Sequence, residues 1–239
     1  MNIYYKYGTI YTSKLKGDNV TDLFLVDTTK LYNDNIFYKN YNQLSEYRKF
    51  KTDKMKMRKD KNLSIGIGIL LNNYLNRYGK SEKDIIYTFS KSGKPYLKNI
   101  SNVFFNPSHS KNISICAFSD SEVGCDIEFI DEKTSHLNIA KRFFSAYEQN
   151  FTFSNTSLNE QLERFYRIWT LKESYLKFAG IGLGGISSIE IKFDNEIPII
   201  YFNNKEQNIF FKEYSYNNYK ISVCSKNNNF QKEIIIINI

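Results

Sequence analysis

Two segments of the chain combine regular secondary structure with acidic side chains, and together they constrain the fold more than any other feature. Residues 123–128 are apolar and β-rich. Because residues two apart in a strand point to the same side, Asp126 and Glu128 are predicted to share one face. The second segment has helical spacing, which puts Glu173 and Lys177 on neighbouring turns. We expect the fold to bring this strand and this helix together.

Three carboxylates that converge from a strand and a helix suit Mg²⁺, a hard cation that prefers oxygen and usually keeps waters and substrate phosphate in its shell. We therefore predict Asp126, Glu128 and Glu173 as metal ligands, with Mn²⁺ as a second candidate ion. A lysine beside such a site can neutralise a phosphate. Either segment alone is more often ordinary surface, because short motifs misfire often. The two together favour a phosphate-handling site.

The composition is that of a globular, basic protein. The 239 residues are 41% hydrophobic, which is enough for a core, and the formal net charge is +8. This charge predicts attraction to an anionic partner, such as nucleic acid, a nucleotide or an acidic protein, by steering that weakens with salt. The densest basic run, residues 48–61, is interrupted by acids and lacks stacked aromatics, which argues against dedicated nucleic-acid binding.

The cysteines and the lack of a long apolar run predict a cytoplasmic protein that does not enter a membrane. The cysteines are widely spaced, without a C-x-x-C pair, so we interpret them as small buried residues in a reducing compartment: Cys116, Cys125 and Cys224. The amino terminus lacks the apolar region of a signal peptide, and no apolar run approaches the roughly 20 residues needed to span a bilayer.

Hydrophobic periodicity predicts a helix followed by strands, twice along the chain. The first half is expected to contain an opening strand near 2–12, a helix over about 54–78 and strands over 85–90 and 113–118. Gly66 and Gly68 inside that helix either weaken it or mark close packing against a neighbour. The second half is expected to contain helices near 136–150 and 159–178 and strands near 186–193, 197–202, 208–216 and 219–225, and the terminal segment 233–239 fits a closing strand.

This repeated order predicts an α+β fold with two similar α/β halves, each a long helix packed on a small, mainly antiparallel sheet. The halves are residues 1–118 and 119–239, and the second carries the metal site.

Five short blocks occur in a set order: Gly93-Lys94-Pro95, Phe105–Ser110, Gly124–Asp126, Ala140–Ser145 with Glu148, and Trp169–Lys177. In this order they resemble the surfactin-type 4′-phosphopantetheinyl transferases, enzymes that attach the phosphopantetheine arm of coenzyme A to a carrier-protein serine. A chain of this length resembles the family's monomeric, pseudo-dimeric members, whose two halves hold coenzyme A in a cleft between them. The resemblance assigns these residues to coenzyme A binding: Arg48, Lys51, Ser64, Lys94, Ser108, His109 and Lys172.

The resemblance also implies a reaction. A carrier serine hydroxyl attacks the β-phosphate of coenzyme A and releases 3′,5′-ADP. Phosphoryl transfer needs alignment and charge neutralisation. Asp126, Glu128 and Glu173 are expected to hold Mg²⁺, and Lys177 to offset charge on the leaving pyrophosphate oxygen. Three acceptors of the serine proton stay open: Glu173, Glu148 or water.

The expected partners are coenzyme A and an acidic apo acyl or peptidyl carrier protein, towards which a basic enzyme would be steered. Two alternatives remain. Another Mg²⁺-dependent phosphate enzyme, such as a phosphohydrolase or nuclease, could use the same carboxylates but would not need Gly93-Lys94-Pro95 or Ser108-His109. A basic, non-catalytic nucleic-acid-binding module would be indifferent to loss of the carboxylates.

Overall fold

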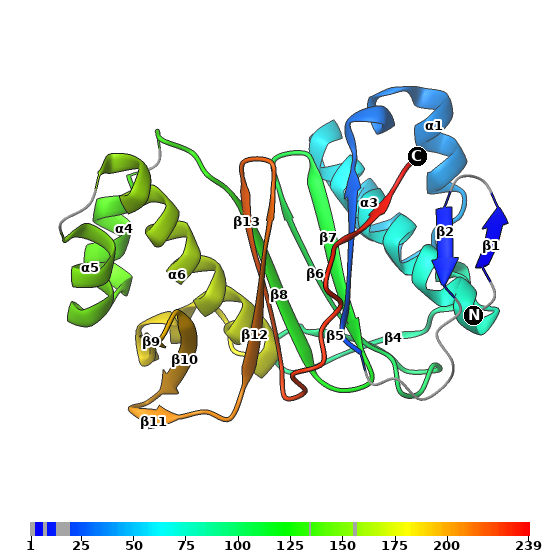
Figure 1. The fold of residues 1–239 in the computed structure, drawn as a ribbon. Coiled ribbons are helices and arrows are strands. Elements are labelled where there is room, and N and C mark those ends of the chain that lie inside the picture. The colour runs from blue at the N-terminus through cyan, green and yellow to red at the C-terminus, as the bar shows by residue number, and fades with distance from the viewer. Residues whose placement is uncertain (1–2, 7–8, 13–19, 134, 155–156) are drawn as a thin grey trace.

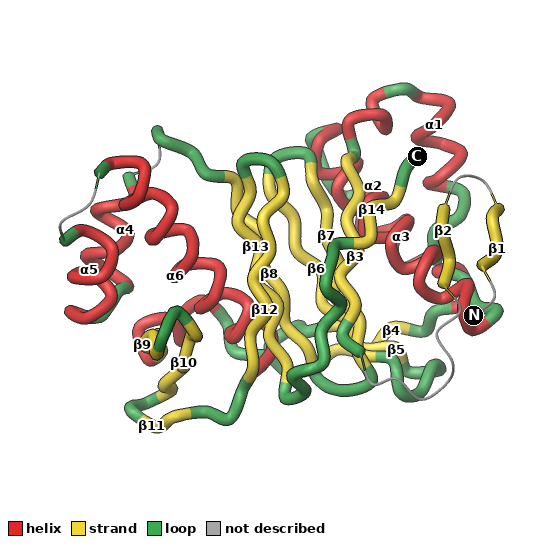
Figure 2. Tube along the Cα trace, viewed as in Figure 1, coloured by secondary structure: helices red, strands yellow, loops and turns green. Residues whose placement is uncertain are grey.

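The computed structural model describes residues 3–6, 9–12, 20–133, 135–154 and 157–239, and it shows a mixed α+β protein (Figure 1). Helices lie at the two ends of the molecule, with the strands between them (Figure 2). The sheets are small and mainly antiparallel, as predicted. The similarity of the two halves stays a prediction. No helix in the described ranges is long and apolar enough to cross a membrane.

The first half of the chain is centred on helix α3 (Arg58–Leu75), which packs against the sheet of order β14-β3-β7-β6. The predicted helix over 54–78 was therefore correct in place but too long at its start. The other elements here are β1 (Ile3–Lys6), β2 (Thr9–Thr12), β3 (Asp22–Asp27), α1 (Asp34–Tyr41), α2 (Glu46–Asp53), β4 (Tyr87–Phe89), β5 (Pro95–Leu97), β6 (Phe104–Ser110) and β7 (Ile113–Ser119).

Three features of this half differ from the sequence prediction. The opening strand predicted near 2–12 is instead the antiparallel pair β1 and β2, with residues 2 and 7–8 outside the described ranges. Helices α1 and α2 were not predicted. Each begins at a polar N-cap whose side chain accepts backbone N–H groups, Asn33 for α1 and Ser45 for α2. Strand β6 was recognised as a sequence block but not as a strand.

The second half is centred on helix α6 (Leu158–Ala179), which packs on the sheet of order β12-β13-β8. The predicted helix over 136–150 is two helices, because Ser145 caps a new one and Glu148 closes a capping box with it. The other elements are β8 (Val123–Phe129), α4 (His136–Phe143), α5 (Ala146–Phe153), β9 (Ile189–Asp194), β10 (Ile197–Phe202), β11 (Lys205–Glu206), β12 (Phe210–Tyr216), β13 (Tyr219–Ser225) and β14 (Ile235–Ile237).

The strand predicted over 233–239 is present as β14, but it belongs to the sheet of the first half. It runs parallel to β3, with Ile236 beside Leu25. Figure 1 shows the red end of the chain lying against the blue strand β3. The closing strand predicted from sequence is therefore present, and it completes the sheet of the first half.

Strands β6 and β8 lie together where the two sheets meet, and polar side chains of β6 join them. Asn106 Oδ1 accepts the Cys125 N–H at 2.9 Å. Two residues further on, the Ser108 hydroxyl donates to Asp126 Oδ1 at 2.9 Å. Alternate side chains of a strand point to one side, so this row brings polar groups of β6 to the acidic face of β8.

Candidate active site

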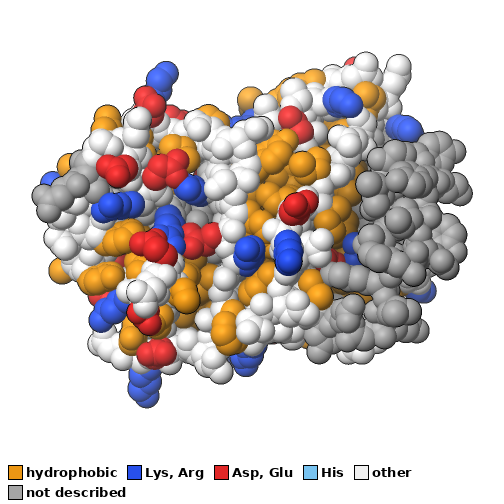
Figure 3. All heavy atoms as spheres, viewed as in Figure 1, with side chains coloured by type: hydrophobic (Ala, Val, Ile, Leu, Met, Phe, Trp, Pro, Cys, Tyr) orange, Lys and Arg blue, Asp and Glu red, His pale blue; other side chains and the backbone are white. Residues whose placement is uncertain are grey.

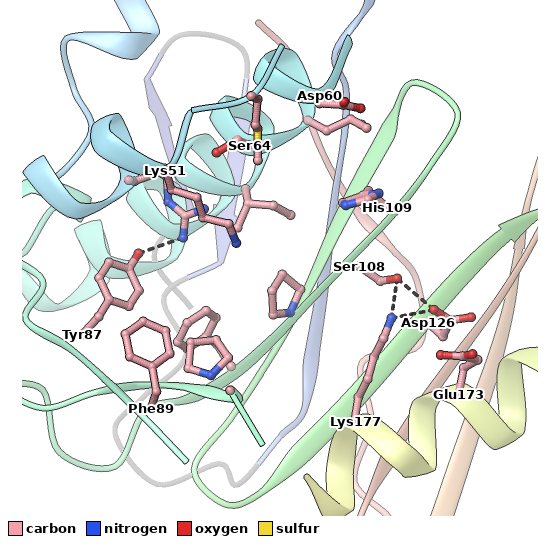
Figure 4. A pocket seen from close by; sticks show the side chains of 18 of the residues that line it. Lys51, Asp60, Ser64, Tyr87, Phe89, Ser108, His109, Asp126, Glu173 and Lys177 are labelled. Carbon is pink, nitrogen blue, oxygen red and sulfur yellow. Dashed lines mark hydrogen bonds and ion pairs between the residues drawn. The ribbon is translucent and has the colours of Figure 1, made fainter. Parts of the chain in front are cut away.

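A cleft of about 770 Å³ is lined by residues of both halves (Figure 4). Helices α2 and α3 and strands β4 and β6 form one wall, and β8 and α6 form the other. The cleft brings together nine of the residues predicted from sequence: Arg48, Lys51, Ser64, Ser108, His109, Asp126, Glu128, Glu173 and Lys177. Lys94 and Lys172 are not among its lining residues.

The acidic end of the cleft is formed where α6 faces β8. Figure 4 shows Lys177 reaching from α6 towards Ser108 and Asp126, with Glu173 beside them. Lys177 Nζ lies 2.6 Å from Asp126 Oδ1 and 2.7 Å from Ser108 Oγ. On the neighbouring position of the same strand face, Glu128 Oε2 accepts a 3.1 Å hydrogen bond from Ser110. The Lys177 ammonium thus links α6 to β6 and β8.

Burial and neighbouring charges shift the pKa values of several side chains at this end. Burial raises the pKa of Glu128 to about 7, and the charge of Asp126 adds to the rise. The same two causes raise the pKa of Glu173 to about 7. Burial opposes the charge of Lys177, but Asp126 and its other neighbours outweigh that effect and raise the pKa of its ammonium. The acidic end therefore holds more carboxylates than Lys177 alone can neutralise.

The acidic end fits a hard cation. Asp126 Oδ2 is buried and accepts no hydrogen bond from the described part of the chain. A buried carboxylate oxygen without a partner is costly, and a bound cation would satisfy it. As they stand, the described side chains form no ready-made group of three metal ligands. Lys177 holds the other Asp126 oxygen, and the remaining donors are hard oxygens of the kind that Mg²⁺ prefers.

The basic end of the cleft holds Arg48 and Lys51 on α2, with His109 across from them (Figure 4). Burial and the nearby Arg48 charge lower the pKa of Lys51. Although the His109 side chain is exposed to the cleft, packing on its other sides lowers its pKa, and Lys177 adds to that effect. The buried Ser64 hydroxyl is 2.7 Å from Thr52 Oγ1. This end therefore offers cations and polar donors to an anion.

Sequence reasoning missed an aromatic wall beside this basic end. The Tyr47 ring lies 4.9 Å from that of Tyr87 and 5.3 Å from that of Phe89, measured between centroids, and all three line the cleft. Tyr87 and Phe89 alternate along β4, so they share a face, a pattern that the sequence does show. The third ring comes from α2, a helix that was not predicted.

Comparison with known proteins decides the family. The model of the 4′-phosphopantetheinyl transferase superfamily matches residues 122–224. The 4′-phosphopantetheinyl transferase Sfp of Bacillus subtilis strain 168 is 31% identical over 174 residues, 71% of this chain and 76% of that protein. The chain belongs to the 4′-phosphopantetheinyl transferase family.

Two further transferases support this membership. The 4′-phosphopantetheinyl transferase ffp of Bacillus subtilis is 32% identical over 164 residues, 67% of this chain and 72% of the relative. The 4′-phosphopantetheinyl transferase gsp of Aneurinibacillus migulanus is 34% identical over 145 residues, 60% and 59% of the two chains. The prediction of a transferase of this family, made from five sequence blocks, is confirmed.

Within this phosphopantetheinyl transferase, Lys94 lies beside the cleft rather than on its lining. Its buried ammonium lies 2.5 Å from Glu122 Oε2 and donates to the Phe178 carbonyl at 2.9 Å. Phe178 belongs to the last turn of α6, where carbonyl groups lack helical partners. Lys94 therefore ties the turn before β5 to the end of the helix that carries Glu173.

The resemblance assigned Lys172 to coenzyme A binding, whereas the structure places Lys172 away from the lining of the cleft. Its side chain is fully buried, and Nζ lies 2.6 Å from Glu148 Oε2 and 2.9 Å from the Phe143 carbonyl. Glu148 in turn accepts the Ile191 N–H at 2.8 Å. The pair joins α5, α6 and β9 behind the site, and neither residue lines the cleft.

Proposed function

We propose that this transferase moves the 4′-phosphopantetheine arm of coenzyme A to a serine of an apo acyl or peptidyl carrier protein, with Mg²⁺, and releases 3′,5′-ADP. The observation that carries the proposal is the polarity of one cleft. Asp126, Glu128 and Glu173 gather at one end and Arg48 and Lys51 line the other, while the fourth lining carboxylate, Asp60, lies near His109. Coenzyme A also has two anionic groups, a pyrophosphate and a separate 3′-phosphate, so the two ends suit the two groups.

At the acidic end, Asp126, Glu128 and Glu173 would hold Mg²⁺, which neutralises charge on the pyrophosphate when bound. Lys177 is fixed between β6 and β8, since Nζ contacts Ser108 and Asp126. From this place its ammonium can offset the charge that develops on the leaving oxygen. The residues align and neutralise the reacting groups, which is the main need of phosphoryl transfer.

Glu173 is our preferred acceptor of the serine proton. It lines the cleft one turn from Lys177, and in the metal-free protein burial and the Asp126 charge raise its pKa to about 7, so its surroundings favour uptake of a proton. Glu148, the other carboxylate considered from sequence, is fully buried and holds Lys172. A water molecule beside Glu173 remains a compatible relay for the same proton.

The predicted halves, residues 1–118 and 119–239, form the two walls of the cleft in this proposal, as in a pseudo-dimer. We place the enzyme in the cytoplasm as a monomer and expect an acidic carrier, because the net charge of +8 favours such a partner. On the face in Figure 3, positive and negative side chains are mixed over the helices of the second half. Attraction of an acidic carrier would therefore come from the field of all charges of the protein together rather than from a single basic patch on this face.

The test is to incubate the protein with coenzyme A, Mg²⁺ and purified apo carrier proteins, and to measure intact carrier masses. One phosphopantetheine per carrier is expected. Asp126→Asn keeps the side-chain shape but removes the charge, and we expect it to abolish transfer while the circular dichroism spectrum is unchanged. No mass gain on any carrier, together with hydrolysis of a phosphate ester or cleavage of nucleic acid, would instead support the alternative enzymes.

A further inference from the structure

Glu82 carries a fully buried carboxylate that belongs to none of the sequence blocks. It opens a short 3-10 turn (Glu82–Asp84) after α3. Its backbone N–H donates to Asn72 Oδ1 at 2.6 Å, which anchors the turn to the end of that helix. A buried acid almost always has partners that compensate its charge, so its contacts indicate what it does.

The carboxylate of Glu82 joins the helix and the strand that form the basic end of the cleft. Oε1 accepts hydrogen bonds from Arg48 Nε at 2.8 Å, from the Tyr87 hydroxyl at 2.7 Å and from Ser45 Oγ at 2.9 Å. Oε2 accepts the Ser45 backbone N–H at the start of α2. One side chain therefore fixes α2 and β4 relative to each other.

Two hydrogen bonds fix the Arg48 guanidinium, and its other N–H groups are available to a ligand. Its Nε–H bonds Glu82, and Nη2 donates to the Tyr87 hydroxyl at 2.9 Å. A guanidinium has five N–H donors, so three remain without a partner among the described residues. Arg48 and Tyr87 both line the cleft, whereas Glu82 does not. The arrangement holds a planar cation at the edge of the cleft with free donors for a phosphate.

We propose that Glu82 is a positioning residue, which fixes the Arg48 guanidinium and the Tyr87 ring so that they bind the phosphate of coenzyme A that enters the basic end. This inference rests on the proposed function. Glu82 would act on ligand binding and not on the chemical step, because Asp126, Glu128, Glu173 and Lys177 lie at the other end of the cleft.

The decisive variant is Glu82→Gln, which keeps the size of the side chain and removes its charge. We expect the KM for coenzyme A to rise about tenfold, the size of effect that weakening a charge-assisted hydrogen bond produces, while kcat changes less than twofold. The Kd for coenzyme A, measured by calorimetry without carrier, should rise by the same factor. Tyr87→Phe removes one hydrogen bond to each partner but keeps the ring, so a rise of about threefold is expected.

Asp22→Asn is the matched control. Asp22 is also a buried acid of the first half, and its Oδ2 lies 2.7 Å from Arg77, but neither residue lines the cleft. This control should lower the melting temperature and leave the KM for coenzyme A unchanged. A Glu82 variant that behaves in the same way would overturn the inference, as would an unchanged KM for Tyr87→Phe if Glu82→Gln does not fold.

Dephospho-coenzyme A, which lacks the 3′-phosphate, identifies the phosphate concerned. If Arg48 contacts the 3′-phosphate, Glu82→Gln should weaken coenzyme A tenfold but dephospho-coenzyme A less than twofold. Equal weakening of both ligands would place the pyrophosphate at the basic end and still support the role of Glu82. A wild-type protein that binds coenzyme A but modifies no carrier would refute the proposed function while leaving the binding test of Glu82 intact.

Discussion

The two long helices pack closely against their neighbours by different means. On α3 the glycines are in the helix: a Cβ at Gly66 would lie 2.7 Å from Thr28 Cγ2, and one at Gly68 would overlap the Leu44 side chain. At α6 the glycine is in the strand instead. A Cβ at Gly124 of β8 would overlap the Ser174 carbonyl and lie 2.5 Å from the Phe178 nitrogen.

This difference determines how firmly each helix is held in place. Side chains such as Leu44 can change rotamer, so the first contact tolerates small shifts. Gly124 meets backbone, which cannot yield without moving α6 as a whole. The helix with Glu173 and Lys177 is thereby held at a set distance from Asp126, two residues beyond the glycine. The Gly-x-Asp spacing thus has a packing reason as well as a chemical one.

Each half also contains a fully buried glutamate in an ion pair, Glu82 in the first and Glu148 in the second, and the two pairs differ in their access to the cleft. The Arg48 pair with Glu82 borders the cleft, whereas the Lys172 pair with Glu148 is enclosed, with both side chains 0% exposed. The first pair is therefore expected to govern ligand binding and the second to govern stability. The variants that follow test this contrast between the halves.

Lys172→Met should have the largest effect on stability. Removing one partner leaves the Glu148 carboxylate buried and unpaired, which typically costs about 3–5 kcal/mol of unfolding free energy. We expect urea unfolding to show this loss, while the Kd for coenzyme A of the folded fraction stays unchanged. A selective loss of coenzyme A affinity would contradict the structural role and restore the one predicted from sequence.

Gly124→Ala should combine loss of stability with loss of activity. The added methyl group pushes α6 away from β8, at about 3 kcal/mol, the upper end for overpacking. A displacement of about 1 Å between Asp126 and Glu173 should lower transfer at least a hundredfold. The measurements are thermal melting and kcat on one carrier. A stable, fully active variant would show that the backbone contact does not set the geometry of the site.

Metal binding should depend on pH. Without a metal, the raised pKa values of Glu128 and Glu173, both about 7, mean that the folded protein binds more protons than the unfolded chain between about pH 4.5 and 7. Stability of the metal-free protein should therefore fall as the pH rises through this range. Mg²⁺ competes with those protons, so it should raise the melting temperature more at pH 8 than at pH 5.5. Asp126→Asn should abolish this difference.

Gly68→Ala should have the smallest effect. The added methyl group meets the end of the Leu44 side chain, which can move, so we expect a loss of about 1 kcal/mol. The kcat per folded molecule should stay within twofold of the wild type, because the methyl group is directed at Leu44 and Arg48 Cδ rather than at the carboxylates. Any change in the KM for coenzyme A would report a shift of Arg48. An effect as large as that of Gly124→Ala would remove the distinction drawn between the two helices.

The parts of the site on β8 and α6 could be predicted from sequence, because strong periodicity fixed the faces on which Asp126, Glu128 and Glu173 lie. The sequence left two interpretations of Gly66 and Gly68, a weaker helix or close packing against a neighbour, and the structure supports close packing. Helix α2 was missed because its sequence is mostly polar and its stability comes from Ser45 and from packing. Local sequence rules do not show such tertiary support.

The roles of the lysines show a second limit. A lysine in a binding motif and a lysine in a buried ion pair have the same sequence signature. Lys172 is distinguished by Glu148, which lies 24 residues away and becomes its neighbour only after α5 folds against α6. Glu82 was overlooked for the same reason, since Arg48 and Tyr87 come from other elements.

The parallel pairing of β14 with β3 has a consequence for the order of folding. Ile235–Ile237 must reach a strand near the opposite end of the chain, and Lys30 Nζ also donates to the Ile239 carbonyl at 2.7 Å. Contacts between such distant residues raise contact order and slow folding. On the ribosome, the edge of β3 stays unpaired until these residues emerge, so the first half to be synthesised is among the last parts to be completed.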